Sequence, residues 1–371
     1  MKLNEIALHN YRNYKETTLN FSKNLNIFLG ENAQGKTNLL ESIYVLAMTR
    51  SHRTNNEKEL IQWQELQAKI NGSIDKYSGT IPLEIQLSNK GRKTKINYIE
   101  QKRLSAYIGQ LNVILFASED LSLVKGPPQI RRKFINMELG QVDLVYLHNL
   151  VQYQGVLKHR NQYLKQLAEK KEKDFLYLDI LSEQLAEFGS KVLLARLSLI
   201  KKLEYWANQL HKKISHDKEQ LTITYSSSIT LPTILTQETL QQEFLRQLKE
   251  NRKRELFKMT TFIGPHRDDL IFNINDQNVQ IYGSQGQQRT TALSIKLAEI
   301  DWMHEELGEY PILLLDDVMS ELDNERQLHL LETIEGKVQT FLTTTNLEHL
   351  TDKLTVEPDI FTVHKGIIER N

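Results

Sequence analysis

The segment that begins at Gly30 carries the residues best suited to hold a phosphate. It reads Gly30-Glu31-Asn32-Ala33-Gln34-Gly35-Lys36-Thr37, which fits the pattern GxxxxGK[ST]. The two glycines let the backbone curl so that successive N–H groups face an anion. Lys36 would reach the β- and γ-phosphates, and the Thr37 hydroxyl would coordinate Mg²⁺. We expect all eight residues to line a nucleotide site; the alternative is an ordinary Gly-rich turn between a strand and a helix.

Two adjacent carboxylates end an apolar run farther along the chain. Asp316 and Asp317 follow Pro311-Ile312-Leu313-Leu314-Leu315, a run typical of a central strand covered on both faces. Two charges at the end of such a strand are costly without a cation. We therefore predict that both aspartates are catalytic, with Asp316 holding Mg²⁺ and Asp317 positioning an attacking water. The alternative is a solvated Asp-Asp turn.

A second anion site is indicated shortly before that strand. Its sequence is Ser284-Gln285-Gly286-Gln287-Gln288-Arg289, at the start of a helix predicted over 288–303. A Ser hydroxyl and a Gly N–H at a helix N-terminus can hold an anion. Taken alone, this segment is more typical of a polar loop. Its position in the chain before the acidic strand, and its distance in sequence from Asp316, favour the anion site.

Short strands and long helices must position these motifs. Apolar and β-branched runs predict strands over 2–8, 25–29, 80–87, 93–98, 112–116, 270–274, 311–315, 340–344 and 360–363. No proline occurs between Pro128 and Pro232, and apolar residues at steps of three and four predict helices over 143–170, 174–214 and 237–258. Residues 170–174 read as a helical hairpin turn. We predict an α/β head split in the sequence, 1–135 and 259–371, by a mainly helical arm, 136–258.

Composition excludes several kinds of site. The 371 residues include no cysteine, which excludes disulfides, Cys-ligated metals and thiol catalysis and suits a reducing compartment. The first residues lack the apolar core of a signal peptide, and no run of about 18 apolar residues occurs. We therefore expect a cytoplasmic protein with no membrane partner.

Any DNA contact must come from local basic clusters, because Lys+Arg and Asp+Glu both total 47. The candidates are Arg50, His52, Arg53, Lys93 and Lys95, and further basic groups are 131–133 and 252–254. Arg and Lys contact phosphates without reading sequence. The alternative for any one of these clusters is a solvated face, which is the more common role of such a group.

The order of the motifs resembles that of the ATP-binding-cassette ATPases. In these, S-x-G-Q is followed by an acidic strand end and then by a D-loop, here Ser320-Glu321-Leu322-Asp323. The wide separation of phosphate loop and acidic strand resembles the chromosome-maintenance and recombination-repair ATPases, and among these the RecF family. The resembling stretches run through the whole chain: 10–14, 30–38, 49–53, 116–121, 125–128, 131–134, 262–269, 284–289 and 313–323.

The resemblance implies a concrete function. A protein of this kind binds ATP and Mg²⁺, forms an ATP-dependent homodimer, and binds DNA at single-strand gaps. Its weak, DNA-stimulated ATPase acts as a binding switch. It works with RecR and RecO proteins to load recombinase, in replication-fork maintenance, DNA repair and the SOS response. The resemblance also assigns Arg12 and Asp323 to the nucleotide site, and it places Ser284, Gly286 and Gln287 against the nucleotide of the other subunit.

Two departures from the cassette pattern stand out. Most cassette ATPases have Glu where this chain has Asp317, and the shorter side chain suits slow hydrolysis. The usual switch histidine has no match, so a hydroxyl of Thr343, Thr344 or Thr345, at the end of the next strand, would sense the γ-phosphate.

A transporter's nucleotide-binding subunit is disfavoured by the long proline-free insertion. A GTPase is disfavoured because Asn89-Lys90-Gly91-Arg92 lacks the Asp of a guanine-reading motif.

Overall fold

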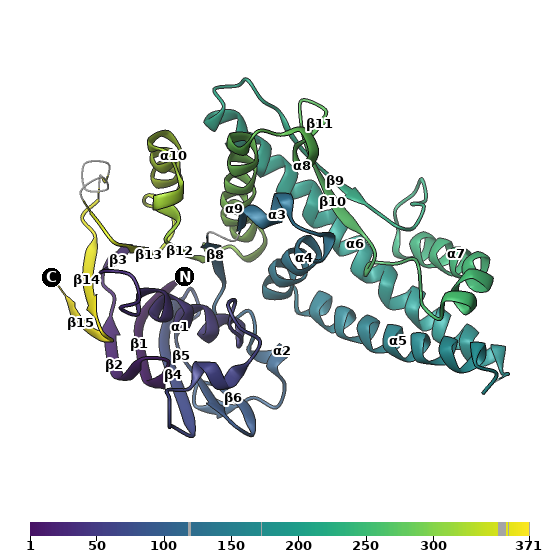
Figure 1. Cartoon of the computed structure of the whole chain (residues 1–371), viewed down its shortest axis with the longest axis horizontal. Helices are drawn as coiled ribbons and strands as arrows, with labels where there is room; N and C mark the ends of the chain where they lie inside the picture. The colour runs from purple at the N-terminus through teal and green to yellow at the C-terminus, as the bar shows by residue number, and fades with distance from the viewer. Residues whose placement is uncertain (118–119, 172, 348–353, 355, 371) are drawn as a thin grey trace. The chain divides into compact units, whose positions relative to one another are not determined.

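The computed structural model describes residues 1–117, 120–171, 173–347, 354 and 356–370. The chain divides into two compact units (Figure 1). Unit 1 comprises Met1–Leu121, Leu210–Lys218 and Ala292–Asn371, and unit 2 comprises Ser122–Gln209 and Glu219–Thr291. The two units are defined by contacts between residues and are divided at positions other than the predicted domain boundaries. Those boundaries therefore stay a prediction. Residues 118 and 119 of one resembling stretch, and residue 172 of the predicted turn, lie outside the described residues.

Unit 1 contains an antiparallel sheet of six strands. In spatial order these are β2 (Tyr14–Asn20), β1 (Lys2–Tyr11), β4 (Gln67–Lys76), β5 (Gly79–Ser88), β6 (Gly91–Ile96) and β7 (Ile99–Glu100). Buried and partly exposed residues alternate along β4 and β5, as expected for a sheet with one covered face. A 3₁₀ turn, η1 (Glu57–Leu60), precedes β4, and a short helix, α2 (Leu104–Tyr107), follows β7.

The second sheet of unit 1 is largely parallel. Its order is β15 (Ile367–Arg370), β14 (Asp359–His364), β3 (Leu25–Leu29), β13 (Thr340–Thr344), β12 (Ile312–Asp316) and β8 (Val113–Ala117). Only β15, at the edge, pairs antiparallel. β13 is buried throughout, and β12 up to its last residue, which matches the prediction of a central strand for 311–315. Phe21, Phe28, Phe341 and Phe361 pack their rings together beside β3.

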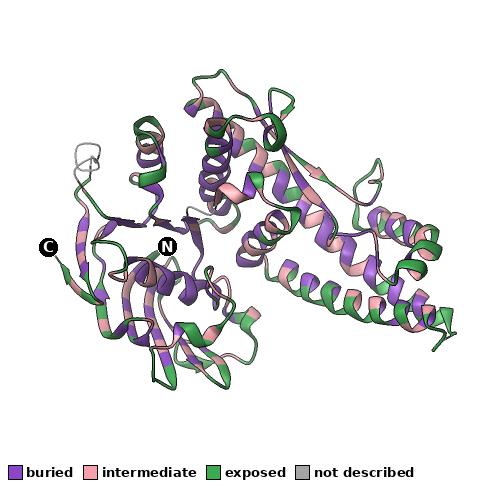
Figure 2. Cartoon of the chain, viewed as in Figure 1, coloured by how far each residue is buried: buried purple, intermediate pink, exposed green. Residues whose placement is uncertain are grey.

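Helix α1 (Lys36–Met48) follows β3 and is buried along most of its length (Figure 2). It packs against β12 and β13 of one sheet and against β4 and β5 of the other, so its apolar residues have no free face. The remaining elements of unit 1 are most of α9 (Gln285–Leu307), the 3₁₀ turn η3 (Val318–Glu321) and α10 (Asn324–Ile334). α9 begins in unit 2 and passes into unit 1 at residue 292.

Unit 2 is mainly helical. Its helices are α3 (Leu121–Lys125, which starts at the last residue of unit 1), α4 (Pro128–Val142), α5 (Leu144–Ala168), α6 (Phe175–Ile214, whose last residues belong to unit 1), α7 (Gln237–Lys258) and α8 (Val279–Tyr282). The predicted long helices are confirmed, and α7 has the predicted bounds. The leucines at positions 178, 181, 185, 199, 203 and 210 of α6 are buried, as the apolar stripe requires.

The strands that sequence patterns missed have more polar faces. β9 (Leu221–Ser226) lies within the stretch predicted as the helical arm and pairs antiparallel with β10 (Asp269–Ile274), which also pairs with β11 (Gln277–Asn278). β2, β4 and β15 were also not predicted. In β2, only Tyr14 and Leu19 are buried and most of the other residues are exposed, so it lacks the apolar run that identified the other strands. Among the described residues, no helix is both long and apolar enough to cross a membrane.

Candidate functional site

The parallel sheet brings the two main motifs to one edge. β13 lies between β3 and β12: Thr343 is opposite Phe28 on one side and Asp316 on the other. The loop after β3 and the acids at the end of β12 therefore emerge from the carboxyl ends of strands separated by a single strand. This edge is where open α/β sheets bind ligands.

The loop 30–37 adopts a backbone conformation that favours glycine at two positions. Gly35 has φ +117°, and a Cβ there would lie 2.5 Å from Asn13 Nδ2 and 2.9 Å from the Tyr14 hydroxyl. A Cβ on Gly30 would lie 2.4 Å from the Val363 carbonyl oxygen. Tyr14 Oη donates to the Gly35 carbonyl at 2.9 Å. Gly30 is thus required by a close backbone neighbour, and Gly35 by its positive φ and the side chains packed against it.

The start of α1 offers open donors and a lysine. No side chain caps this helix at Gly35, so its first N–H groups are available to an anion. Lys36 Nζ donates to the carbonyl oxygens of Gly30 at 2.5 Å and Glu31 at 2.8 Å. Burial lowers the pKa of Lys36, and the nearby carboxylates of Asp317 and Asp316 oppose that shift without cancelling it. The ammonium group is therefore already folded over the loop.

Hydroxyl groups join the phosphate loop to the acidic strand end. Thr37 Oγ1 donates to Asp316 Oδ1 at 3.0 Å, and Thr343 Oγ1 donates to the same oxygen at 2.9 Å. The backbone N–H of Asp317 donates to Thr343 Oγ1 at 2.8 Å. Asp317 has φ +54°. A cavity of about 350 Å³ lies here, lined by Asn32, Ala33, Gly35, Lys36, Thr37, Asn38, Arg53, Asp317 and Thr343.

These oxygens suit Mg²⁺. The ion prefers hard oxygen ligands, keeps several waters, and is held by one or two carboxylates together with substrate phosphates. Thr37 and Asp316 provide a hydroxyl and a carboxylate in contact, which fits that requirement. Over the described residues, no cluster of three or more His, Cys, Asp or Glu could hold a metal ion by itself, so the phosphates and waters would complete the coordination.

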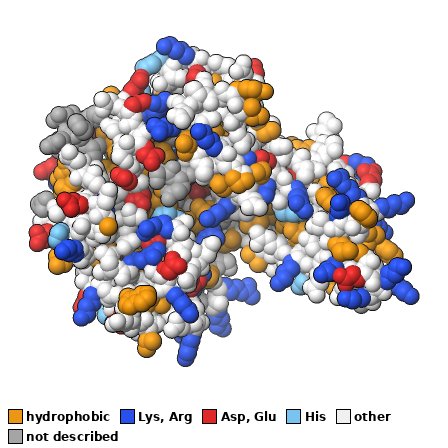
Figure 3. Space-filling model, viewed as in Figure 1, with side chains coloured by type: hydrophobic (Ala, Val, Ile, Leu, Met, Phe, Trp, Pro, Cys, Tyr) orange, Lys and Arg blue, Asp and Glu red, His pale blue; other side chains and the backbone are white. Residues whose placement is uncertain are grey.

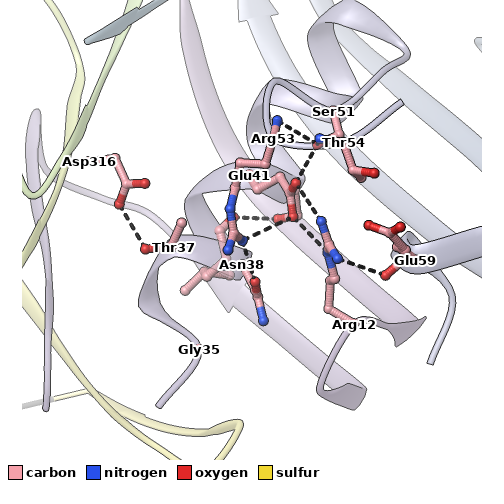
Figure 4. A network of polar contacts seen from close by, with 12 residues as sticks. Arg12, Gly35, Thr37, Asn38, Glu41, Ser51, Arg53, Thr54, Glu59 and Asp316 are labelled. Atoms are coloured by element: carbon pink, nitrogen blue, oxygen red, sulfur yellow. Dashed lines mark hydrogen bonds and ion pairs between the residues drawn. The ribbon is translucent and has the colours of Figure 1, made fainter. Parts of the chain in front are cut away.

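Glu41 organises a polar network beside the phosphate loop (Figure 4). Its buried carboxylate accepts from Arg12 Nε at 2.9 Å and Nη2 at 2.8 Å, from Ser51 Oγ at 2.5 Å and from Tyr11 Oη at 3.2 Å. Arg53 approaches within 3.8 Å and donates to Asn38 Oδ1 at 2.9 Å. Burial raises the pKa of Glu41, but hydrogen bonds from Arg12 and Ser51 outweigh it and hold the pKa below its ordinary value.

Sequence reasoning missed this role of Glu41. The available signal was a glutamate among the apolar residues of α1, which needs a cation if it is buried. Arg12, predicted as a nucleotide contact, is bound here to Glu41 and donates to the Glu59 carbonyl at 2.9 Å. Arg12 also lines a second cavity, of about 490 Å³, with Asn38 and the exposed Trp63. Its assignment to the nucleotide stays a prediction.

The signature segment lies at the N-terminus of α9. Ser284 Oγ accepts from the Gln287 N–H at 3.2 Å, and the Ser284 N–H donates to Gln287 Oε1 at 2.9 Å. Gln287 Nε2 also donates to Glu219 at 2.8 Å, and Gly286 lies in the first turn. Asp323 accepts from the Arg326 N–H at 3.0 Å and so caps α10. These residues are placed at helix starts, and their contact with nucleotide stays a prediction.

The predicted DNA contacts differ in their surroundings. Arg50 is exposed, His52 packs against Tyr44 with ring centroids 5.1 Å apart, and Arg53 lines the cavity beside the loop. Lys93 pairs with Glu100 at 3.3 Å, and Lys95 pairs with Glu84 at 2.8 Å. On the face in Figure 3, Lys and Arg side chains are interspersed with Asp and Glu and form no continuous basic surface. The DNA role of these five residues stays a prediction.

Comparisons with known proteins identify the family of this chain. Residues 2–369 match the RecF/RecN/SMC N-terminal domain family. A DNA replication and repair protein RecF from Enterococcus faecalis is 75% identical over 372 residues, covering 100% of this chain and 99% of the relative. The RecF protein of Latilactobacillus sakei is 54% identical over 99% of this chain and 98% of its own.

Solved structures give the same result. The recombination mediator protein RecF with ATP, in the RecFOR pathway, has a TM-score of 0.91 and 33% identity, covering 100% of this chain and 97% of that one. An SMC head bound to the C-terminal winged-helix domain of ScpA has a TM-score of 0.58 at 13% identity, which shows a shared fold only. The predicted α/β head of cassette type with a helical arm is thereby confirmed. The chain belongs to the RecF/RecN/SMC family and, within it, to the RecF proteins of DNA replication and repair.

Proposed function

We propose that this chain binds ATP and Mg²⁺ at the loop 30–37 and uses them to control binding to DNA at single-strand gaps. The observation that carries the proposal is the hydrogen bond of 3.0 Å between Thr37 and Asp316. It joins the phosphate loop to the acidic strand end, although the two residues are 279 positions apart in the chain. The relative with 33% identity was solved with ATP, which supports the choice of nucleotide.

Each group has a distinct part in this proposal. The N–H groups at the start of α1 and the Lys36 ammonium hold the phosphates. Thr37 and Asp316 would hold Mg²⁺, which neutralises charge on the phosphates. Asp317 would orient the attacking water, and its short side chain makes turnover slow. The chain thus acts as a weak, DNA-stimulated ATPase whose nucleotide state works as a binding switch.

We also propose the assembly and the pathway that the resemblance implies. Two copies would enclose ATP, with Ser284, Gly286 and Gln287 of one copy against the γ-phosphate held by the other. The dimer would work in the cytoplasm with RecR and RecO proteins to load recombinase at gaps, in replication-fork maintenance, repair and SOS induction. DNA would be held through its backbone, by residues such as Arg50 and Arg53.

Nucleotide binding by a Lys36→Ala variant tests the core of the proposal. The variant removes the ammonium group but leaves the strand, the loop glycines and the helix intact. We expect ATP binding, measured by titration calorimetry, to be lost or greatly weakened, while thermal unfolding is close to that of the wild type. Lys90→Ala, in an exposed turn, is the matched control and should bind normally. Wild-type affinity in a folded Lys36→Ala variant would remove the assignment of the phosphate loop.

A further inference from the structure

A loop in unit 2 gathers arginines around one aromatic ring. The loop, residues 259–268, joins α7 to β10. The Arg254 guanidinium carbon lies 4.5 Å from the centre of the Phe262 ring, and that of Arg267 lies 5.8 Å from it. Both arginines are exposed, and Phe262 is partly buried. Arg267 is also tied to the loop, because its Nη2 donates to the Thr261 carbonyl at 3.1 Å.

A third arginine reaches the same loop from α4. Arg132 Nη1 donates to the backbone carbonyl of Asp268, next to Arg267, at 2.8 Å. Burial lowers the pKa of Arg132, and the positive charges of Arg196 and Arg267 add to that shift against the pull of Asp269 and Asp268. Burial lowers the pKa of His266 to about 4, and Arg267, Arg132 and Arg196 contribute. At neutral pH the imidazole is uncharged, and the positive charge here comes from the arginines.

The nearby carboxylates do not balance these charges. Asp269 forms its ion pair with Arg131 at 2.6 Å, and Glu255 pairs with the buried Arg160 at 2.7 Å. Asp268 is buried and accepts from the Ser228 hydroxyl at 2.6 Å and from Tyr225 at 2.7 Å. Burial raises the pKa of Asp268 above its ordinary value in spite of these bonds.

Other arginines of unit 2 differ from these three because they form ion pairs with carboxylates. Arg246 and Arg252, on the same helix as Arg254, both pair with carboxylates. Among the described residues, Arg132, Arg254 and Arg267 have no carboxylate within 4.0 Å of their guanidinium nitrogens. Arg254 and Arg267 thus lie against one ring, and Arg267 and Arg132 bond to backbone carbonyls of the same loop.

We propose that Arg254 and Arg267, which lie against Phe262, together with Arg132, which bonds to the same loop, bind the phosphodiester backbone of DNA. The proposal rests on the proposed function and adds a contact surface in unit 2 to the candidates in unit 1. Guanidinium groups fit phosphate oxygens with two parallel hydrogen bonds, and stacking on an aromatic ring fixes their planes. Arg254 and Arg267 lie open on the surface, so the site suits a phosphate on a long strand that passes over the protein. The contact carries no sequence preference, because phosphates are the same in every sequence.

The test removes the two exposed charges and measures how DNA binding depends on salt. The wild type, Arg254→Gln/Arg267→Gln and the control Arg246→Gln/Lys249→Gln are titrated with a fluorescent gapped duplex at several salt concentrations. The control removes two positive charges from the same helix, away from Phe262. Each lost phosphate contact lowers the slope of log affinity against log salt by about 0.9, so the Arg254/Arg267 variant should show a slope lower by about two. A slope equal to that of the control would overturn the site.

A charge-preserving variant separates binding from a structural role. Arg254→Lys/Arg267→Lys keeps both charges but loses the planar groups that stack on Phe262, so its salt slope should stay near that of the wild type. If the Lys and Gln variants lose binding equally, the arginines support the loop and do not contact DNA. ATP binding should be unchanged in all four proteins. A wild type that binds no DNA would overturn both this site and the proposed function, whereas normal wild-type binding with an unaffected Gln variant would overturn only the site.

Discussion

Asp316 is bound by two hydroxyl groups, and no basic side chain neutralises it among the described residues. Thr37 and Thr343 both donate to its Oδ1 atom, and Lys36, whose pKa is influenced by Asp316, bonds to the carbonyls of its own loop. A carboxylate in this setting is available to a metal ion. Asp317, one residue on, lines the cavity. The two aspartates therefore have different predicted roles, and single substitutions can distinguish them.

The first prediction therefore concerns these two aspartates. Asp317→Asn removes the carboxylate that would orient water but leaves the phosphate cradle, so steady-state ATP turnover should fall far more than ATP affinity. Asp316→Asn removes a Mg²⁺ ligand, so Mg²⁺-dependent ATP binding should weaken as well. Coupled-assay turnover and calorimetric binding, with and without Mg²⁺, give the comparison. Wild-type turnover in both variants would contradict the catalytic assignment.

The second prediction concerns Glu41, whose side chain is fully buried while that of Arg12 is 16% exposed. Glu41→Gln leaves the guanidinium of Arg12 without its counter-charge, and breaking such a buried pair costs about 3 kcal/mol. The free energy of unfolding at pH 7, from urea titration, should fall by about that amount. A variant as stable as the wild type would mean that Glu41 contributes no net stability.

The pH dependence of this effect has a definite sign. The pKa of folded Glu41 is below its ordinary value, so the unfolded state binds the proton more readily. The stabilisation is fully present above the pKa of the unfolded state and is lost as the pH falls through the lower pKa of the folded state. The difference in stability between the wild type and Glu41→Gln should therefore shrink below about pH 4, near the ordinary glutamate pKa.

At the scale of elements, β13 positions the site without supplying a charged group. Its buried Thr343 hydroxyl connects the side chain of Asp316 to the backbone of Asp317. The sequence suggested that one of Thr343, Thr344 and Thr345 senses the γ-phosphate. Thr343 lines the cavity, whereas Thr344 Oγ1 donates to the Asn346 carbonyl at 2.9 Å. Of these two, Thr343 is therefore the better candidate.

The third prediction concerns the Thr343 hydroxyl. Thr343→Val keeps the shape of the side chain but leaves the Asp317 N–H without its acceptor, and an unmade buried hydrogen bond costs about 1–3 kcal/mol. We expect ATP turnover to fall about tenfold, which corresponds to about 1.4 kcal/mol, while circular dichroism stays unchanged. Thr343→Ser keeps the hydroxyl and should retain most of the activity. Equal loss in both variants would point to packing and not to the hydrogen bond.

Local sequence patterns predicted the elements whose ends are marked by clear sequence signals. They did not predict contacts between residues far apart in the sequence. β3, β13 and α7 were predicted with the bounds that the structure has, because apolar periodicity and turn residues define them. The bond between Arg12 and Glu41 joins residues 29 positions apart, and the pairing of Lys95 with Glu84 depends on the register of β5 and β6. Neither is visible in a local pattern. The sequence patterns identified the motif residues but not the residues that bond to them.

At the scale of the whole molecule, the fourth prediction concerns assembly. If Ser284 of one copy meets the γ-phosphate held by another, ATP and not ADP should convert monomer to dimer. Ser284→Arg should block that dimer by its bulk, yet leave ATP binding by the monomer nearly intact. Light scattering coupled to size exclusion, with each nucleotide, measures both states. A wild-type dimer that forms equally well without nucleotide would defeat nucleotide gating.

Mixing two inactive variants tests whether the site is completed in trans. A heterodimer of Ser284→Arg and Lys36→Ala contains one undamaged composite site, so part of the ATPase activity should return on mixing. Each variant alone, at the same total concentration, is the control. A mixture as inactive as its parents would count against completion in trans, provided that one site can turn over alone.

The strand order of the parallel sheet also constrains how the chain is made. β3 pairs with β13 on one side and β14 on the other, and Asn26 bonds to the carbonyl of Thr340, 314 residues later. At about 5–20 residues per second, a ribosome needs roughly 15–60 s to supply those neighbours. During that time an apolar central strand next to the phosphate loop has neither of its partners, and exposed strands of this kind associate with other chains. The native pairing of β3 can therefore form only once the last tenth of the chain is being synthesised.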